Sequence, residues 1–255
     1  MLKDKIVLIT GATSGIGKSC AVAFASEGAN LILIARREER LLNLSSSLTE
    51  GYKIKVLPIV LDVRNNSEVK KTIGKLTDEW KSIDILINNA GLARGFSKIN
   101  DGEVEHWEEM IDTNLKGLLY VTRAVSPLMV EREKGHIINI GSTAGHEAYI
   151  YGNVYCATKF AVKGLTQAIR IDLLDKNIKV TTVDPGMVVT EFAKVRFSGD
   201  EERAAKVYEG VNPLGPDDVA QAVLFAATRP AHVNINEIII TPTQQASSTQ
   251  VHRKK

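Results

Sequence analysis

The chain has little cysteine. Its 255 residues include only two, Cys20 and Cys156. They stand far apart in the sequence, so they offer neither a disulfide framework nor the close spacing of a metal-binding motif. We therefore expect no metal site, and a reducing cytoplasm as the default location.

The chain also lacks a strong excess of charge and any long apolar run. The formal net charge is only +2, with both signs scattered, which predicts no nucleic-acid or membrane-surface partner. The start "MLKDKIVLIT" is too short in apolar residues for a signal peptide, and no run approaches the ~18 residues of a membrane span. The basic end "VHRKK" is expected to be a solvated terminus. Its 44% hydrophobic and 24% charged residues are typical of a soluble globular chain.

What the sequence does have is a regular alternation of short β-branched runs with longer helical patterns. This rhythm predicts βαβ units, a parallel α/β sheet and a single domain over residues 1–255. The expected strands are residues 5–10, 31–35, 55–61, 83–89, 136–141, 179–184 and 237–241. The expected helices are residues 16–27, 38–49, 67–80, 104–133, 153–176 and 217–228. Pro58 cannot donate to a strand ladder, so the third strand is predicted to lie at an edge or to contain a bulge.

One segment breaks this rhythm, from about residue 187 to residue 215. It follows the carboxyl end of an expected strand, where open α/β sheets bind their ligands. We predict that it forms a small helical substrate lid. The alternative is a pair of surface helices with no role in binding.

A glycine-rich stretch, "TGATSGIGKS", follows the first expected strand directly. Gly11, Gly15 and Gly17 permit positive φ and let backbone N–H groups approach an anion, and the following helix N-terminus adds partial positive charge. The stretch stands between a strand and a helix, as a dinucleotide-binding motif requires. It predicts a pyrophosphate cradle, and its predicted cofactor-binding residues are Gly11, Thr13, Ser14, Gly15, Ile16 and Gly17.

The end of the second expected strand distinguishes between cofactors. A carboxylate there accepts hydrogen bonds from a free ribose 2′-OH, whereas arginine pairs with a 2′-phosphate. Here Arg36 and Arg37 take that place, which favours NADP(H) over NAD(H), and Ser14 adds a hydroxyl donor. The alternative is that both arginines belong to a solvated helix start beside Glu38 and Glu39.

Two further strand ends supply candidate contacts to the nucleotide. Asp62 and Val63 follow the third strand and suit the edge and face of an adenine. The "NNAG" stretch, Asn88 to Gly91, follows the fourth, with Asn89, Ala90 and Gly91 as the predicted contacts. Because the carboxyl ends of parallel strands meet at one edge, these residues should outline one crevice.

The stretch "YIYGNVYCATKF" contains three tyrosines, of which one is placed for chemistry. A tyrosine with its ordinary pKa near ~10 is a poor proton shuttle at neutral pH, and a nearby cation lowers that pKa. On a helix the neighbours are i+3 and i+4. Only Tyr155 has a lysine there, Lys159; Tyr149 and Tyr151 are expected at the substrate mouth or packed on the lid.

Two polar residues elsewhere complete the expected catalytic group. Ser142, at the end of the fifth strand, can hold a carbonyl or alcohol oxygen while Tyr155 transfers the proton. Asn114 lies in a long helical segment where asparagine is a poor helix former, which suggests a role such as fixing a water that connects Lys159 to solvent.

These motifs together resemble the short-chain dehydrogenase/reductase family. The matching stretches are "TGATSGIG", "NNAG", Asn114, Ser142, "YCATK" and "DPGMVVT". The resemblance implies a Rossmann-type, doubly wound sheet of about seven parallel strands, a homotetramer and an Asn114–Ser142–Tyr155–Lys159 tetrad. It also implies that Lys159 and Tyr155 contact the nicotinamide ribose and that the nicotinamide is framed by Pro185, Gly186, Val188 and Thr190.

The last third of the chain resembles a narrower branch, the NADP-dependent 3-hydroxy acid dehydrogenases that act on L-serine and L-allo-threonine. The relevant stretches are "TEFAKVRFSGD", "PDDVAQAV", "PAHVNINEI" and "VHRKK". A carboxylate-bearing substrate calls for a fixed guanidinium, and Arg196 in the lid is the candidate. The alternative is that Arg196 is a surface residue that forms an ion pair with Glu191 or Asp200. The stretch "HEAY" departs from the branch, and Glu147 would repel a substrate carboxylate unless it points away.

Three other functions share parts of this pattern. A 3-oxoacyl carrier-protein reductase or general carbonyl reductase would keep the tetrad but need an open mouth rather than Arg196. A non-enzymatic NADP(H) sensor would ordinarily lack part of the tetrad. A sugar epimerase also pairs tyrosine with lysine, but the glycine spacing and the short chain disfavour it. The scattered histidines suggest no metal site, and His136 is expected merely to open a strand.

Overall fold

The computed structural model describes residues 2–254, and its centre is one parallel sheet. The strand order is β3-β2-β1-β4-β5-β6-β7, and every pairing is parallel. The strands are β1 (Ile6–Thr10), β2 (Asn30–Ala35), β3 (Val56–Val60), β4 (Ile83–Asn88), β5 (Gly135–Ile140), β6 (Ile178–Pro185) and β7 (Glu237–Ile240). The predicted Rossmann-type fold is confirmed. Its order reverses direction between β1 and β4, which places the ligand crevice at that point.

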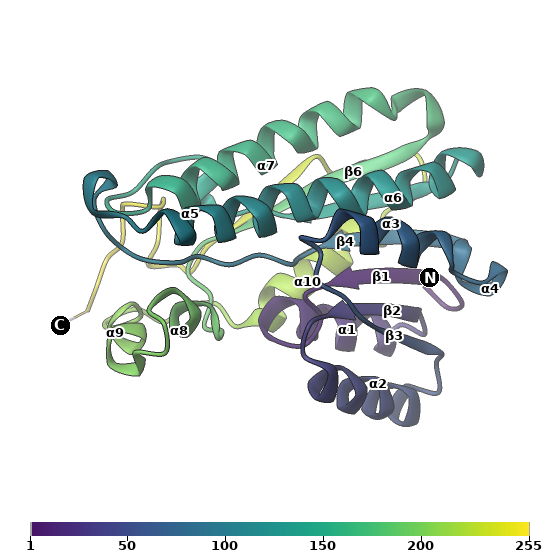
Figure 1. Ribbon diagram of the computed structural model, residues 1–255, viewed down its shortest axis with the longest axis horizontal. Helices are drawn as coiled ribbons and strands as arrows, with labels where there is room; N and C mark the ends of the chain where they lie inside the picture. Colours follow the sequence, from purple (N-terminus) through teal and green to yellow (C-terminus); the bar gives the residue numbers. More distant parts are fainter. Residues whose placement is uncertain (1, 255) are drawn as a thin grey trace.

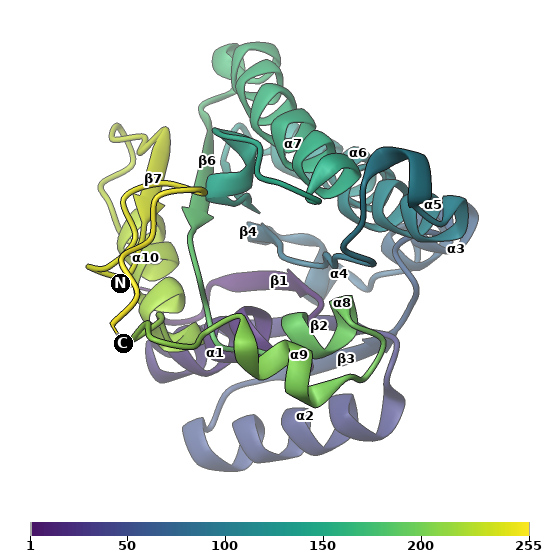
Figure 2. The same cartoon turned by 90° about the vertical axis from the view of Figure 1, so that its left-hand side faces the viewer.

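Helices cover both faces of the sheet (Figures 1 and 2). One face carries α1 (Gly15–Ser26), α2 (Glu38–Tyr52) and α10 (Pro216–Ala227). The other carries α3 (Asn66–Gly74), α4 (Asp78–Lys81), α5 (Val104–Ile111), α6 (Leu118–Glu131) and α7 (Asn153–Asp172). Two short helices, α8 (Phe192–Arg196) and α9 (Glu201–Lys206), lie beyond the carboxyl ends of the strands, where the lid was predicted.

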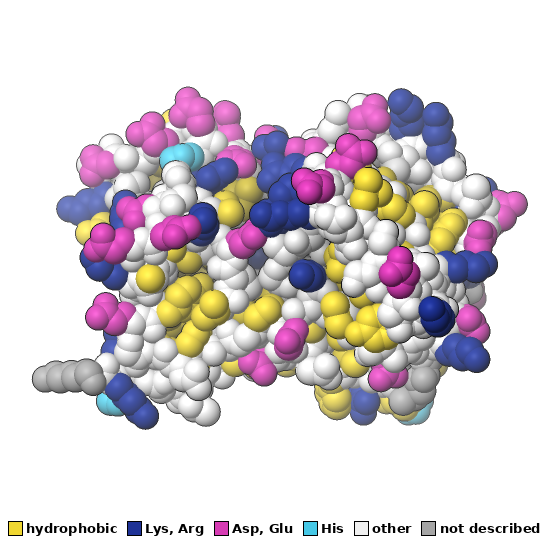
Figure 3. Space-filling view, turned by 90° about the horizontal axis from the view of Figure 1, so that it is seen from below, with side chains coloured by type: hydrophobic (Ala, Val, Ile, Leu, Met, Phe, Trp, Pro, Cys, Tyr) yellow, Lys and Arg dark blue, Asp and Glu magenta, His cyan; other side chains and the backbone are white. Residues whose placement is uncertain are grey.

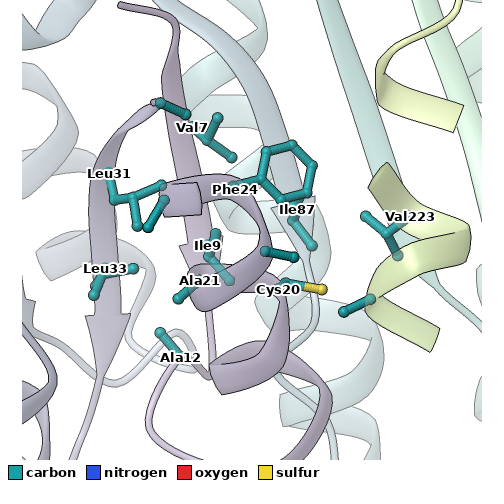
Figure 4. Close-up of a cluster of buried hydrophobic side chains, with 14 of the residues drawn as sticks. Val7, Ile9, Ala12, Cys20, Ala21, Phe24, Leu31, Leu33, Ile87 and Val223 are labelled. Atoms are coloured by element: carbon teal, nitrogen blue, oxygen red, sulfur yellow. The ribbon is translucent and has the colours of Figure 1, made fainter. Parts of the chain in front are cut away.

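The core follows from strands that are apolar on both faces. Val7, Ile9, Leu31 and Leu33 point toward α1, whose Phe24 is fully buried against them (Figure 4). The alternate residues of the same strands, such as Leu8 and Ile32, join the cluster under the opposite helices. Because helices bury both faces of the sheet, the strands and the loops at their ends are held in fixed positions.

Two predicted helices are interrupted in the structure. Residues 67–80 form α3 and α4, separated at Lys75 to Thr77, and residues 104–133 contain a π-helical turn at Asp112–Gly117. The π turn holds Asn114, whose side chain bonds the backbone of Leu92 in another element. Pro58 lies on β3 at the edge of the sheet, as predicted.

The described part of the basic end, residues 251–254, is exposed from His252 onward, as the prediction of a solvated terminus expected, and it also bonds residues of the predicted lid. The backbone N–H of Lys254 donates to Gly210 O at 2.8 Å, and the Arg253 guanidinium donates to the carbonyls of Val207 and Glu209. Within residues 2–254, no helix has both the length and the apolarity needed to cross a membrane.

His136 is a buried neutral side chain in β5. Its Nε2 lies 2.7 Å from Thr181 Oγ1, which itself donates to Ile235 O, so the imidazole N–H is on Nε2. Burial lowers the pKa of His136 to about 3, with Lys179 adding to the effect. The sequence suggested only that this residue opens a strand.

This burial predicts a stability loss in acid. Below pH 6.5, the ordinary pKa of the group, the unfolded chain takes up a proton that the folded chain refuses down to about pH 3. The free energy of unfolding should therefore fall by about 2 kcal/mol between about pH 6.5 and pH 5 from this group alone. Urea denaturation of wild type beside His136→Gln checks it, since glutamine does not titrate. If the free energy of unfolding fell by the same amount with pH in the two proteins, the prediction would be contradicted.

Candidate active site

A cleft of about 780 Å³ opens beyond the carboxyl ends of the strands. It is lined by the glycine-rich loop, by the ends of β2 to β6, by the lid and by the carboxyl-terminal stretch. Among the predicted site residues, only Gly17 and Asn114 lie outside its lining, just behind it. On the face seen in Figure 3, acidic and basic side chains are interspersed, without a broad patch of one sign.

The glycine-rich loop fits a pyrophosphate. Gly11 and Gly15 have φ of +66° and +48°, and an added Cβ at Gly17 would lie 2.4 Å from Gly11 O and from the Asn89 amide. The backbone therefore turns too tightly for any side chain there. The first turn of α1 carries no acidic residue, and the Ser14 hydroxyl makes no capping bond. Free N–H groups and the positive helix end thus face the cleft.

The two predicted phosphate-binding arginines line the cleft and have different partners. Arg36 NH1 lies 3.8 Å from Asp62 Oδ2. Arg37 donates to Glu191 at 2.8 Å and to Thr13 Oγ1 at 3.3 Å. Both guanidiniums are about half-exposed at the start of α2, beside Glu38 and Glu39, and both residues line the cleft, so the phosphate-binding role remains a prediction beside the solvated alternative.

Arg40 and Arg64 are two further basic residues that the sequence did not reveal. Arg40 binds Glu191 Oε1 at 2.7 Å, so Arg37 and Arg40 together fix the first residue before α8. Their hydrogen bonds lower the pKa of Glu191. Arg64 holds Asp62 at 2.6 Å; although burial favours the neutral acid, the bonds from Arg64 hold the pKa of Asp62 below its ordinary value.

The ends of β4 and β6 form the middle of the cleft. Asn89 donates to Thr10 O at 2.9 Å, which ties the loop after β4 to the loop after β1. Asn88, in contrast, is buried below the cleft and bonds Thr122 and Asn139. After β6, Gln245 from the carboxyl-terminal stretch accepts from Met187 N and packs on Gly186. That glutamine was not predicted.

The predicted catalytic side chains converge at one side of this cleft. Tyr155 and Lys159 come from α7 and are 9% and 8% exposed. Ser142 ends the loop after β5, where its hydroxyl accepts from Ala144 N at 3.1 Å. The Lys159 ammonium donates to Ile140 O at 2.9 Å and lies 5.9 Å from the centre of the Tyr155 ring.

The pKa of Tyr155 does not follow the simple expectation of a nearby lysine. Burial raises it, while Arg196 and a hydrogen bond with Ser142 lower it. Burial also lowers the pKa of Lys159 to about 8, and the charge of Asp184 opposes that effect. Burial therefore moves the two pKa values apart, upward for Tyr155 and downward for Lys159, and favours the neutral form of both groups, so the expected lowering of the tyrosine pKa by the lysine is wrong.

Asn114 joins two parts of the site. Its Oδ1 accepts from Leu92 N, and its Nδ2 donates to Leu92 O, both at 2.8 Å, while Thr158 on α7 lies 3.1 Å away. These two hydrogen bonds to the backbone of Leu92 position the loop after β4 against α7. The predicted role in holding a water remains a prediction.

Arg196 lies over the catalytic tyrosine. Its guanidinium carbon is 5.0 Å from the centre of the Tyr155 ring, and NH2 donates to the Tyr149 hydroxyl at 2.5 Å. Rings of Phe96 and Phe192 complete an aromatic box around it. Its Nε is buried without a hydrogen-bond partner in the described chain.

The alternative ion pairs proposed for Arg196 are not formed. Glu191 is bound by Arg37 and Arg40, and Asp200 caps α9 by accepting from Arg203 N. Glu147 points to the carboxyl-terminal stretch, where it accepts from Thr249 Oγ1 at 2.7 Å. A charged guanidinium in an aromatic box therefore lines the cleft, and a guanidinium in such surroundings is chemically suited to bind an anion.

Sequence reasoning missed the partners that arrive from distant segments. Tyr149 and Arg196 are 47 positions apart, and Gln245 lies 58 positions beyond Met187. No local pattern signals such a pairing. Arg64 alone was detectable, since a basic residue directly after a strand-end aspartate can fold back onto it.

The whole arrangement can hold a dinucleotide and an anionic carbonyl compound side by side. Comparisons with known proteins agree with this chemistry. The family model for short chain dehydrogenases matches residues 5–201. The NADP-dependent 3-hydroxy acid dehydrogenase YdfG of Salmonella typhi is 49% identical over 97% of this chain and 99% of its own.

Two further comparisons extend this likeness. Sulfoacetaldehyde reductase 2 of Chromohalobacter salexigens is 44% identical over 95% of this chain and 96% of its own. A solved structure of serine dehydrogenase in its closed form with NADP⁺ superposes with a TM-score of 0.91 at 47% identity. It covers 98% of this chain and 100% of that one.

Proposed function

The chain belongs to the short-chain dehydrogenase/reductase family, and from that premise we propose that it oxidises small 3-hydroxy acids and reduces the matching 3-oxo acids. It is an NADP-dependent oxidoreductase acting on CH–OH groups. The observation that carries the substrate class is the position of Arg196, 5.0 Å from the Tyr155 ring centre and without a carboxylate partner among residues 2–254.

Each residue of the proposed site has a separate role in the reaction. The Arg196 guanidinium binds both oxygens of the substrate carboxylate, which fixes the other end of a short molecule near Ser142 and Tyr155. The Ser142 hydroxyl holds the reacting oxygen. Tyr155 gives that oxygen a proton in reduction and takes it back in oxidation. When bound, NADP(H) supplies or accepts the hydride on the carbon that bears this oxygen.

Lys159 and the aromatic box support these steps. The Lys159 ammonium, fixed on Ile140 O, places positive charge beside the phenol and is in position to hold the nicotinamide ribose. Phe96 and Phe192 place apolar surface beside the guanidinium, and an ion pair is stronger in a less polar medium. Pro185, Gly186, Val188 and Thr190 line the cleft on the side proposed for the nicotinamide.

The names of the relatives fit one substrate geometry. In a 3-oxo acid and in sulfoacetaldehyde alike, a single carbon separates the anionic group from the reacting carbonyl carbon. The relatives named for such substrates cover nearly the whole chain. An arginine at a fixed distance from the tyrosine suits that spacing and accepts either anion.

Initial rates of NADP⁺ reduction test the proposal. Four hydroxy acids form the panel: L-serine, L-allo-threonine, 3-hydroxybutyrate and 3-hydroxyisobutyrate. We expect turnover of at least one and none of uncharged secondary alcohols at the same concentration. Consumption of NADPH with neutral ketones or acyl thioesters alone would move the enzyme to the general carbonyl reductase or 3-oxoacyl carrier-protein reductase branch.

The preference for NADP(H) is proposed to rest on Arg36 and Arg37. Arg36→Ala should raise the KM for NADP⁺ about tenfold, the effect of losing one charge-assisted contact, and leave the KM for NAD⁺ unchanged. Steady-state kinetics with both cofactors measures this, and Arg40→Ala serves as the control, because Arg40 binds Glu191 and does not line the cleft. Equal effects on the two cofactors would rule out the assignment.

We further propose a cytoplasmic homotetramer. Two separate faces carry exposed apolar side chains, one on α7 with Phe160, Ile171 and Leu174 following it, the other at β7 and α10 with Ile239 and Phe225. Two self-complementary faces are what a tetramer with twofold axes needs. The free state of Cys20 and Cys156 supports a reducing location.

A further inference from the structure

A cluster of charged side chains lies behind Ser142 and Lys159, and no step described above uses it. This rear cluster consists of His146, Lys163, Asp184 and Glu237. The sequence suggested that the histidines were isolated. In the structure His146 Nε2 lies 2.6 Å from Asp184 Oδ2, and its Nδ1 lies 2.7 Å from the Lys163 ammonium.

These distances determine where the protons are. A lysine ammonium can only donate, so His146 Nδ1 is an acceptor and the N–H is on Nε2. That N–H donates to Asp184, and Thr182 Oγ1 donates to the other carboxylate oxygen at 2.5 Å. His146 is therefore neutral, and the negative charge belongs to Asp184, which is 1% exposed.

Asp184 and Lys159 contact neighbouring residues of the loop after β5. The Lys159 ammonium donates to the carbonyl of Ile140. The Asp184 carboxylate packs on the next α-carbon, that of Gly141, where an added Cβ would lie 1.9 Å from Oδ1. A single peptide unit separates the two charges, and Gly141 is the residue that lets them approach.

We propose that Asp184 is the buried counter-ion that keeps Lys159 protonated, and that His146, fixed by Lys163, keeps Asp184 ionised and in place. Asp184 and His146 are positioning residues that act through Lys159. The direction of the electrostatics agrees: burial lowers the pKa of Lys159 to about 8, and the Asp184 charge opposes it. Burial raises the pKa of Asp184, while its bonds from Thr182 and His146 lower it.

The charged groups that face Asp184 come from three elements. Lys159 and Lys163 approach from α7, His146 from the turn after β5, and Glu237 from the start of β7. Glu237 lies 3.6 Å from both His146 Nε2 and Lys163 Nζ and is about one-third exposed, so it stands at the solvent side of the cluster. Glu237 therefore provides a matched control, because it has the same charge as Asp184 but lies farther from Lys159.

The pH dependence of kcat tests the proposal. Because Lys159 is proposed to act as an ammonium beside the phenol, we expect turnover to be lost as the pH rises through the pKa of that lysine. Asp184→Asn removes the counter-charge at nearly constant size and should move the alkaline limb to lower pH by about one unit, whereas Glu237→Gln should move it by less than about 0.3 unit. An alkaline limb of Asp184→Asn that coincides with wild type would overturn the proposal.

A second pair of variants covers the case in which Asp184→Asn does not fold. The amide of His146→Gln can still donate to Asp184 and accept from Lys163, so its alkaline limb should match wild type. His146→Leu removes the donor and should move the limb to lower pH by about half a unit. Coincident limbs for these two variants would refute the role. The inference needs turnover but no particular substrate, so any carbonyl compound that wild type reduces will serve even if the hydroxy-acid assignment fails.

Discussion

Tyr155→Phe is expected to lower kcat about 1,000-fold, because it removes the hydroxyl proposed to pass a proton to the substrate oxygen. The phenol is buried in α7 beside Ser142 and below Arg196. Removing the hydroxyl leaves the ring, so its packing on Phe192 remains. Single-turnover oxidation of NADPH, followed by absorbance, measures the loss.

The Tyr155→Phe protein should bind NADPH almost as wild type does. The glycine-rich loop, Arg36 and Arg37 lie at the other end of the cleft and are untouched. Fluorescence titration with NADPH supplies this control. A variant with normal NADPH binding and more than about one-tenth of the wild-type rate would show that another group carries the proton.

Arg196→Ala is expected to raise the KM for 3-hydroxybutyrate about 100-fold, equivalent to about 3 kcal/mol of lost binding from two charge-assisted hydrogen bonds. The guanidinium is held by Tyr149 and enclosed by aromatic rings, so alanine leaves a neutral, apolar wall. Steady-state kinetics at saturating NADP⁺ measures it.

Arg203→Ala is the matched control for Arg196. Arg203 also belongs to the lid and lines the cleft, but its guanidinium stacks on Phe197 at 4.7 Å. Its loss should change KM by less than about threefold. If the two variants behaved alike, the lid would act through general charge rather than through one fixed guanidinium.

The fold and much of the site were predictable because their signals are local. Strand and helix periods reveal the sheet, and Gly11, Gly15 and Gly17 lie in one loop between a strand and a helix. Tyr155 and Lys159 are neighbours on one helix, four positions apart, so a sequence pattern alone pairs them. Pro58 likewise marked the edge strand by its missing N–H.

The rest depends on contacts between segments that are distant in the sequence. Asn114 lies in a π turn and its amide binds the backbone of Leu92, and no helical period predicts either feature. The basic end of the chain is exposed as expected, but no sequence pattern indicates that the exposed Arg253 guanidinium also donates to the carbonyls of Val207 and Glu209. His146 and Asp184 are 38 positions apart, and only the folded chain shows them joined.

The most direct test of the central claim compares one substrate with and without its negative charge. In wild-type enzyme with NADP⁺, kcat/KM should be about 100-fold higher for 3-hydroxybutyrate than for its methyl ester, because only the acid can pair with Arg196. An ester that is oxidised as efficiently as the acid would contradict the account, since the site would then recognise only the alcohol group of the substrate.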